Sequence, residues 1–120
     1  MSTLSFGMPN RAKSHGDTLR KEDFLLDVTE RAGNLADGVM DMGARSHILD
    51  AVSYLHMAGN ELMRGGHDCG GLPARRAANE LDCAASTLAD EGSAHAAEAS
   101  EIANEIRERF GIKRGARLPP

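Results

Sequence analysis

Four stretches of this 120-residue chain repeat apolar residues at alternating steps of three and four, and this feature constrains the fold most strongly. That spacing places apolar side chains along one face of an α-helix. Aromatic residues make up only 3% of the chain, so a core must be built from Leu, Ile, Val, Met and Ala. Such a core suits packed helices better than a β-sandwich or barrel, which draws on β-branched and aromatic residues. The sequence therefore predicts an all-α fold.

The first pattern carries a broad apolar stripe together with two interior glycines, Gly33 and Gly38. Each glycine costs about 1 kcal/mol relative to Ala in a helix, so this helix needs tertiary support. We expect Gly43 to end or kink it. The stripe consists of Leu25, Val28, Ala32, Leu35, Val39 and Met42, widened by Phe24, Leu26, Ala36 and Met40.

The second pattern covers residues 48–62, with Ser46 placed as an N-cap and Gly65 as the stop. The third opens at Pro73, which fits a first helical position, and runs to Gly92. These start and stop signals predict two further helices of ordinary length.

The fourth pattern follows Ser93, a predicted N-cap, and stops at Gly111. Because the connection at Gly92-Ser93 is so short, the third and fourth helices should form an antiparallel hairpin. The loop over 65–72 and the break at Gly43 predict a second hairpin packed on the first. The expected architecture is an antiparallel four-helix arrangement made of two helical hairpins.

The two ends of the chain differ in composition from the helical domain, which we assign to residues 18–111. Residues 1–17 carry Gly, Pro, Asn and Ser with little periodicity, so we expect a flexible N-terminal arm. Residues 112–120 contain three basic residues and two prolines after a helix stop, and predict a basic C-terminal tail.

The charge and the two cysteines bound the function. A net charge of −4 argues against direct nucleic-acid binding or affinity for an anionic membrane, both of which need a basic excess. No apolar stretch is long enough to span a membrane, and the N-terminus lacks the pattern of a secretory signal. Two cysteines without a disulfide framework indicate a cytosolic protein with reduced thiols.

The second helix has more apolar surface than a single core face requires. Its apolar side chains span about half the circumference, wider than the usual ~100° stripe. It is either the most buried helix, with Met filling gaps, or it carries a second apolar face for another chain. Met-rich helical surfaces serve as adaptable binding faces. The candidate partner-binding residues are Leu49, Tyr54, Met57, Met63 and Met40.

The first helix adds a contrasting acidic stripe on its outer side, relieved by Arg31 and Asn34. Like charges four residues apart destabilise an isolated helix by a few tenths of a kcal/mol, so the stripe does not serve helix stability. It is either a solvated face or an acidic docking surface for a basic partner. The acidic residues are Asp23, Asp27, Glu30, Asp37 and Asp41.

The glycine-rich loop before the third helix is a candidate anion-binding site. A glycine turn that leads into a helix N-terminus with two arginines can hold a phosphate or carboxylate. No Lys-Ser/Thr follows, so the loop is not a P-loop. The alternatives are a plain interhelical connection and cross-helix pairing of the arginines with Glu105 and Glu108. The candidate anion-binding residues are Gly70, Gly71, Arg75 and Arg76.

Catalytic and metal-binding patterns are weak in this sequence. His67 near Cys69 could activate a thiolate, but no third member completes a catalytic set. No Cys-x-x-Cys, His-x-x-x-His or Glu-x-x-His spacing occurs. Cys83 is on the polar side of the third helix, either exposed or covered by a second subunit. We therefore expect a non-enzymatic protein without cofactor or metal.

In size and helical makeup the whole chain resembles the small bacterial anti-activators that hold LuxR-type quorum-sensing regulators away from DNA. The resemblance is one of profile and rests on no motif, so it assigns no residue a role. It implies a cytosolic homodimer that binds a transcription factor. The alternative functions are a small-ligand or anion binder that uses the loop over 65–76, and an inhibitor protein of a phage or mobile element.

Overall fold

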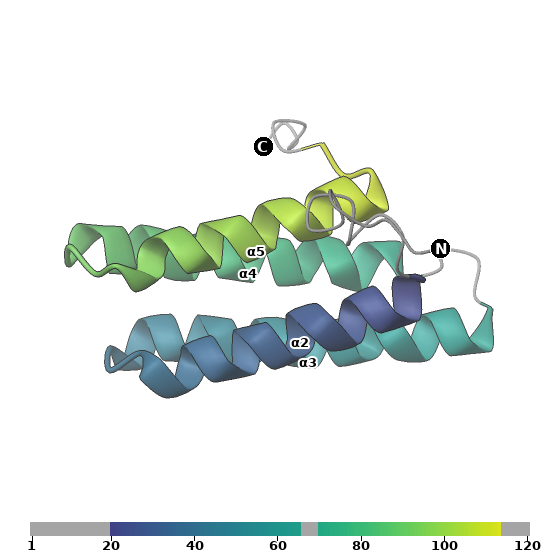
Figure 1. The fold of residues 1–120 in the computed structure, drawn as a ribbon, viewed down its shortest axis with the longest axis horizontal. Helices are drawn as coiled ribbons and strands as arrows, with labels where there is room; N and C mark the ends of the chain where they lie inside the picture. Colours follow the sequence, from purple (N-terminus) through teal and green to yellow (C-terminus); the bar gives the residue numbers. More distant parts are fainter. Residues whose placement is uncertain (1–19, 66–69, 114–120) are drawn as a thin grey trace, which may run out of the picture.

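The computed structural model describes residues 20–65 and 70–113, which form four α-helices and no strand (Figure 1). The predicted all-α, four-helix fold is confirmed. The predicted arm and all but the first two residues of the predicted tail lie outside the described residues. The helices are α2 (Lys21–Gly38), α3 (Met42–Arg64), α4 (Gly71–Asp90) and α5 (His95–Phe110).

Successive helices run in opposite directions and enclose one core (Figure 1). Each helix packs against the next along the chain, and α5 returns to pack against α2. The packing of α3 on α4 is as extensive as that of α4 on α5, so the two halves of the bundle share one interior. This is the geometry of an up-down four-helix bundle.

The core is aliphatic and contains many alanines, as the composition requires. Alanines of all four helices are fully buried, which allows the helix backbones to approach closely. Phe24 and Phe110 lie at the edge of the core, where Lys21 stacks over the Phe110 ring at 4.9 Å. The largest fully buried side chains are Ile48, Leu55, Leu81, Leu88, Ile102, Ile106, Val28 and Val39.

The junction between α2 and α3 differs from the sequence prediction. Gly43 does not end the first helix, because α2 stops at Gly38 and Gly43 is the second residue of α3. The Asp41 carboxylate accepts a hydrogen bond from the Ala44 backbone N–H at 2.8 Å, so Asp41 is the N-cap and Ser46 is not. The prediction was wrong because the Asp41 cap stabilises a helix that starts at Met42, although Gly43 by itself disfavours helix there.

Three polar contacts tie neighbouring helices together. Arg31 of α2 donates two hydrogen bonds to Glu105 of α5, at 2.8 and 3.0 Å. Arg107 of α5 reaches Asp82 and Asn79 of α4. His47 Nδ1 of α3 lies 2.7 Å from a carboxylate oxygen of Glu80 on α4.

These contacts correct one sequence prediction. Arg75 and Arg76 were expected to pair with Glu105 and Glu108 across the α4–α5 hairpin. Both arginines are exposed, and Glu105 is held by Arg31 instead. Glu105 therefore lies on the side of α5 that faces α2, not α4. The rotation of α5 about its own axis decides this, and apolar periodicity alone does not determine that rotation.

Candidate protein-binding surface

The exposed large apolar side chains of the described chain are concentrated on one half of the bundle. Six of the seven lie on α2, on α3 or in the turn between them, and the seventh is in the first turn of α4. Single exposed apolar residues are ordinary, whereas a cluster marks an interaction surface. The seven are Leu26, Met40, Met42, Leu49, Met57, Met63 and Leu72.

Three of these residues correct the predicted core stripe of the first helix. Leu26 is 68% exposed, Met40 88% and Met42 74%, although all three were assigned to the stripe. Leu26 is four residues from both Glu22 and Glu30, and thus lies on the charged side of α2. That neighbourhood is the sequence signal that would have placed it outside.

On α3, a stripe beside the core carries Leu49, Val52, Gly59 and Met63, of which Val52 also packs against the core. These four residues fall within an arc of about 80° at 100° per residue, and Arg45 and His56 lie in the same arc. His47 marks the flank of α3 that faces α4, because it contacts Glu80 there. The stripe lies on the opposite flank, toward α2.

On α2, the corresponding flank carries Leu26 and Gly33. Arg31 marks the other flank, because it is bonded to Glu105 of α5. Since α2 packs against α3, the two flanks adjoin along the outer edge of this helix pair. We call this surface the α2–α3 face. It consists of Leu26, Gly33, Leu49, Val52, Gly59 and Met63.

The structure brings only two of the five predicted partner-binding residues onto this face, Leu49 and Met63. Met57 is exposed but lies about 120° around the helix from the centre of the stripe. Tyr54 is half-buried, packs against the core and lies toward α4. Met40 is in the α2–α3 turn and 88% exposed. The predicted residues therefore do not form a single patch.

The carboxylates of α2 fall into two groups that differ in their contacts. Asp23 lies 3.8 Å from Arg20, and Asp27 lies 3.5 Å from Arg31. The second group, Glu22, Glu30 and Asp37, has no ion pair with any basic side chain of the described ranges. This group lies on the side of α2 that carries Leu26 and Gly33, by helical periodicity. The α2–α3 face is thus bordered by negative charge without a described counter-charge.

Of the predicted anion-binding residues, Gly70 has a packing role that explains why glycine occurs there. Gly70 is buried with φ +83°, and a Cβ there would lie 2.8 Å from the Ala58 carbonyl oxygen. The close approach of Gly70 to α3 therefore requires glycine, whether or not an anion binds there. Gly71 begins α4, while Arg75 and Arg76 are exposed. The rest of the loop, including His67 and Cys69, lies outside the described residues.

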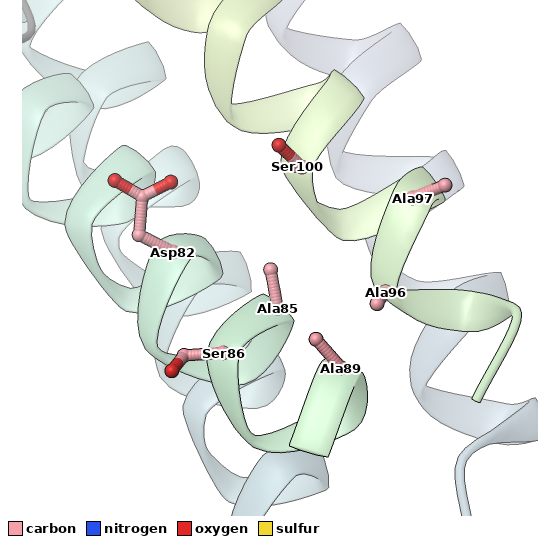
Figure 2. A pocket seen from close by; sticks show the side chains of 7 residues that line it. All are labelled: Asp82, Ala85, Ser86, Ala89, Ala96, Ala97 and Ser100. Atoms are coloured by element: carbon pink, nitrogen blue, oxygen red, sulfur yellow. The ribbon is translucent and has the colours of Figure 1, made fainter. Parts of the chain in front are cut away.

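A groove lies between α4 and α5 (Figure 2). Its volume is about 440 Å³. Figure 2 shows the methyl groups of Ala85, Ala89 and Ala96 lining it, with Asp82 at one end. Asp82 is the one titratable residue in its lining, and that carboxylate already accepts hydrogen bonds from Arg107. The groove therefore offers no pair of groups for acid–base or nucleophilic chemistry.

Cys83 lies outside this groove and is an exposed free thiol. Burial, and after it the charges of Glu80 and Asp82, raise the pKa of Cys83 above its ordinary value. A raised pKa keeps the thiol protonated at neutral pH and makes it a poor nucleophile. In residues 20–65 and 70–113, no three His, Cys, Asp or Glu side chains gather as a metal site. No helix in those ranges is long and apolar enough to cross a membrane.

The carboxyl groups of Asp41, in the α2–α3 turn, and Glu91, at the end of α4, are joined by a hydrogen bond. The pKa of Asp41 is lowered, first because its carboxylate accepts the Ala44 N–H and second because it accepts a hydrogen bond from Glu91. The pKa of Glu91 is raised, chiefly by that same hydrogen bond, and further by desolvation and by the charges of Asp41 and Asp90. The fold therefore favours neutral Glu91 beside ionised Asp41.

We expect Glu91→Gln to raise the free energy of unfolding slightly at pH 7, because glutamine keeps a donor and removes the repulsion. A raised folded pKa means that Glu91 contributes stability below its unfolded pKa and loses it as the pH rises through the folded value. The gain from the variant should therefore vanish as the pH falls toward about 4. Urea denaturation of both proteins at the two pH values measures this. If Glu91→Gln stabilised the protein equally at both pH values, neutral Glu91 would not be donating a hydrogen bond to Asp41.

Among the described surfaces, the α2–α3 face combines exposed apolar side chains with carboxylates that lack a described partner, whereas the α4–α5 groove has one paired carboxylate. No protein-family model, no curated protein and no solved structure matches this chain. What the molecule does is therefore inferred from the chemistry of these surfaces.

Proposed function

We propose that this protein is a non-enzymatic regulator that binds another protein through the α2–α3 face and so sequesters or inhibits it. The observation that carries the proposal is that six of the seven exposed large apolar side chains of the described residues lie on α2, on α3 or in their turn, and three of these, Leu26, Leu49 and Met63, lie on this face; the described length of α5 has none. An α-helical surface with an apolar stripe binds another chain by burying that stripe. The profile resemblance to LuxR-type anti-activators supports a transcription factor as the partner and a cytosolic site of action.

The chemistry of the described residues supports binding rather than catalysis. The thiol of Cys83 is held protonated, and Asp82 is occupied by Arg107. Hydrophobic contacts with adaptable methionines, by contrast, suit a protein partner. The anion-binding alternative gains no support, because packing on α3 already accounts for Gly70.

We expect Leu49→Asp to reduce partner binding at least tenfold, since a carboxylate at a buried apolar contact loses more than about 1.4 kcal/mol. Leu49 is 47% exposed, so the free protein should keep its helicity. The test captures proteins from a bacterial lysate on the immobilised chain, identifies a stoichiometric partner by mass spectrometry and then measures its affinity.

Ala97→Asp is the matched control. Ala97 is exposed on α5 and lines the α4–α5 groove, so the same charge is introduced at a surface away from α2 and α3. The control should bind like the parent protein. If Ala97→Asp loses the partner while Leu49→Asp retains it, the groove is the binding site and the proposed face is wrong.

A further inference from the structure

We infer that the segment bound on the α2–α3 face is a basic amphipathic helix. Its apolar side lies on the stripe of α3, and its Lys and Arg side chains meet the carboxylates of α2. This inference rests on the proposed function and specifies the chemistry of the partner.

The length and spacing of the stripe suit a helix. From Leu49 to Met63 the stripe extends over 14 residue steps, or about 21 Å at 1.5 Å per residue. Its members Leu49, Val52, Gly59 and Met63 follow one another at steps of three, seven and four, and the exposed His56 divides the step of seven. This is the spacing at which two helices pack side by side. A helix of four turns lies along that distance, whereas a tight turn contacts only one or two of these positions.

Two glycines on the face have no packing role within the described chain. A Cβ at Gly33 or at Gly59 would meet nothing within 4 Å. Glycine destabilises a helix relative to alanine, so its presence at both positions needs a reason outside the core. Because glycine has no side chain, the backbone of a second helix can approach α2 and α3 closely at these two positions. Gly33 and Gly59 lie on the adjoining flanks of α2 and α3 that form the α2–α3 face.

The charge around the face selects a basic occupant. Glu22, Glu30 and Asp37 border it from α2 without an ion pair in the described ranges, and Glu22 and Glu30 lie on either side of Leu26. Of the arginines of α3, Arg45 lies in the arc of the stripe one turn before Leu49, and Arg64 follows Met63 at the other end of the helix. The partner's cations are therefore directed toward α2.

The same charges disfavour the other occupants. A second copy seated on this face would add its own acidic α2 to an acidic border, and like charges across an interface oppose association. Nucleic acids and anionic membranes carry the same sign as the face. A basic helix is the partner that satisfies both the apolar stripe and the carboxylates.

Two synthetic peptides of roughly 18 residues, about five helical turns, test the inference. Both carry Leu at steps of three and four, and they differ only in Lys and Arg or Glu at the other positions. We expect the basic peptide to bind the full chain, by fluorescence anisotropy, at least tenfold more tightly than the acidic one. The Glu22→Lys/Glu30→Lys double variant should weaken the basic peptide at least tenfold.

Glu101→Lys/Glu108→Lys is the matched control, because both residues are exposed on α5 and the net charge changes by the same amount. It should bind the basic peptide like the parent protein. Equal weakening by the two double variants would overturn the inference, since net charge and not the face would then attract the peptide.

The remaining outcomes separate this inference from the proposed function. If both peptides bind equally and Leu49→Asp abolishes both, the face binds protein but does not select a basic helix. If neither binds and sedimentation shows a dimer that Leu49→Asp dissociates, a second copy occupies the face and the inference is wrong. If neither peptide binds and Leu49→Asp changes neither oligomeric state nor partner capture, both proposals fail.

Discussion

Replacing Gly70 with alanine is expected to lower the free energy of unfolding by about 3 kcal/mol. Gly70 has φ +83° immediately before α4, where an L side chain is strained, and its added Cβ would lie 2.8 Å from the Ala58 carbonyl oxygen. The contact is with helix backbone, so no side-chain rotation relieves it. The first turn of α4 must move away from α3, which disturbs the buried Pro73 and Ala74.

Gly65→Ala separates the two contributions. Gly65 has φ +69° at the end of α3, but a Cβ there meets nothing within 4 Å. We expect a loss of about 1 kcal/mol from backbone strain alone. Urea denaturation followed by far-UV circular dichroism measures both variants. Equal losses would show that the close approach to Ala58 contributes nothing, and that the α3–α4 junction yields easily.

The number and type of the helices could be predicted from the sequence, because apolar periodicity and glycine stops are local signals. Gly65 and Gly111 end their helices in the left-handed conformation, as the pattern indicated. The start of α3 could not be placed as well, since Asp41 and Ser46 are both good caps. The structure uses Asp41, whose carboxylate accepts the Ala44 N–H, and the sequence pattern does not distinguish the two.

The candidate face could be predicted only in part. An apolar surplus on the second helix was visible, and Leu49 and Met63 belong to the face. Leu26 was missed because a leucine next to Phe24 and Leu25 was assigned to the core. Tyr54 was included because a helical wheel does not show which flank a neighbouring helix covers. Rotation of each helix about its axis follows from packing, not from its own sequence.

Arg107 illustrates the same limit, and its replacement by alanine is expected to destabilise the fold by about 2–3 kcal/mol. The side chain is 7% exposed and inserts between α5 and α4. Its guanidinium donates to both carboxylate oxygens of Asp82, at 3.4 and 2.5 Å, and to Asn79 at 3.3 Å. Removing it leaves Asp82 without this counter-charge. The Asp82 side chain is 31% exposed, so water offsets part of the loss.

Arg31→Ala provides the comparison, because Arg31 also makes a two-pronged contact, with Glu105, yet its side chain is 29% exposed. Arg31 and Glu105 are both partly exposed, so solvent screening holds their pair to about 1 kcal/mol and this variant should lose less stability than Arg107→Ala, whose arginine is the more buried. Arg107→Lys should recover only part of the loss, since an ammonium group lacks the planar fork that spans Asp82 and Asn79. Urea denaturation of the three variants ranks them. If Arg31→Ala proves as costly as Arg107→Ala, burial does not determine the strength of these pairs, and the α2–α5 contact is as important to the bundle as the α4–α5 contact.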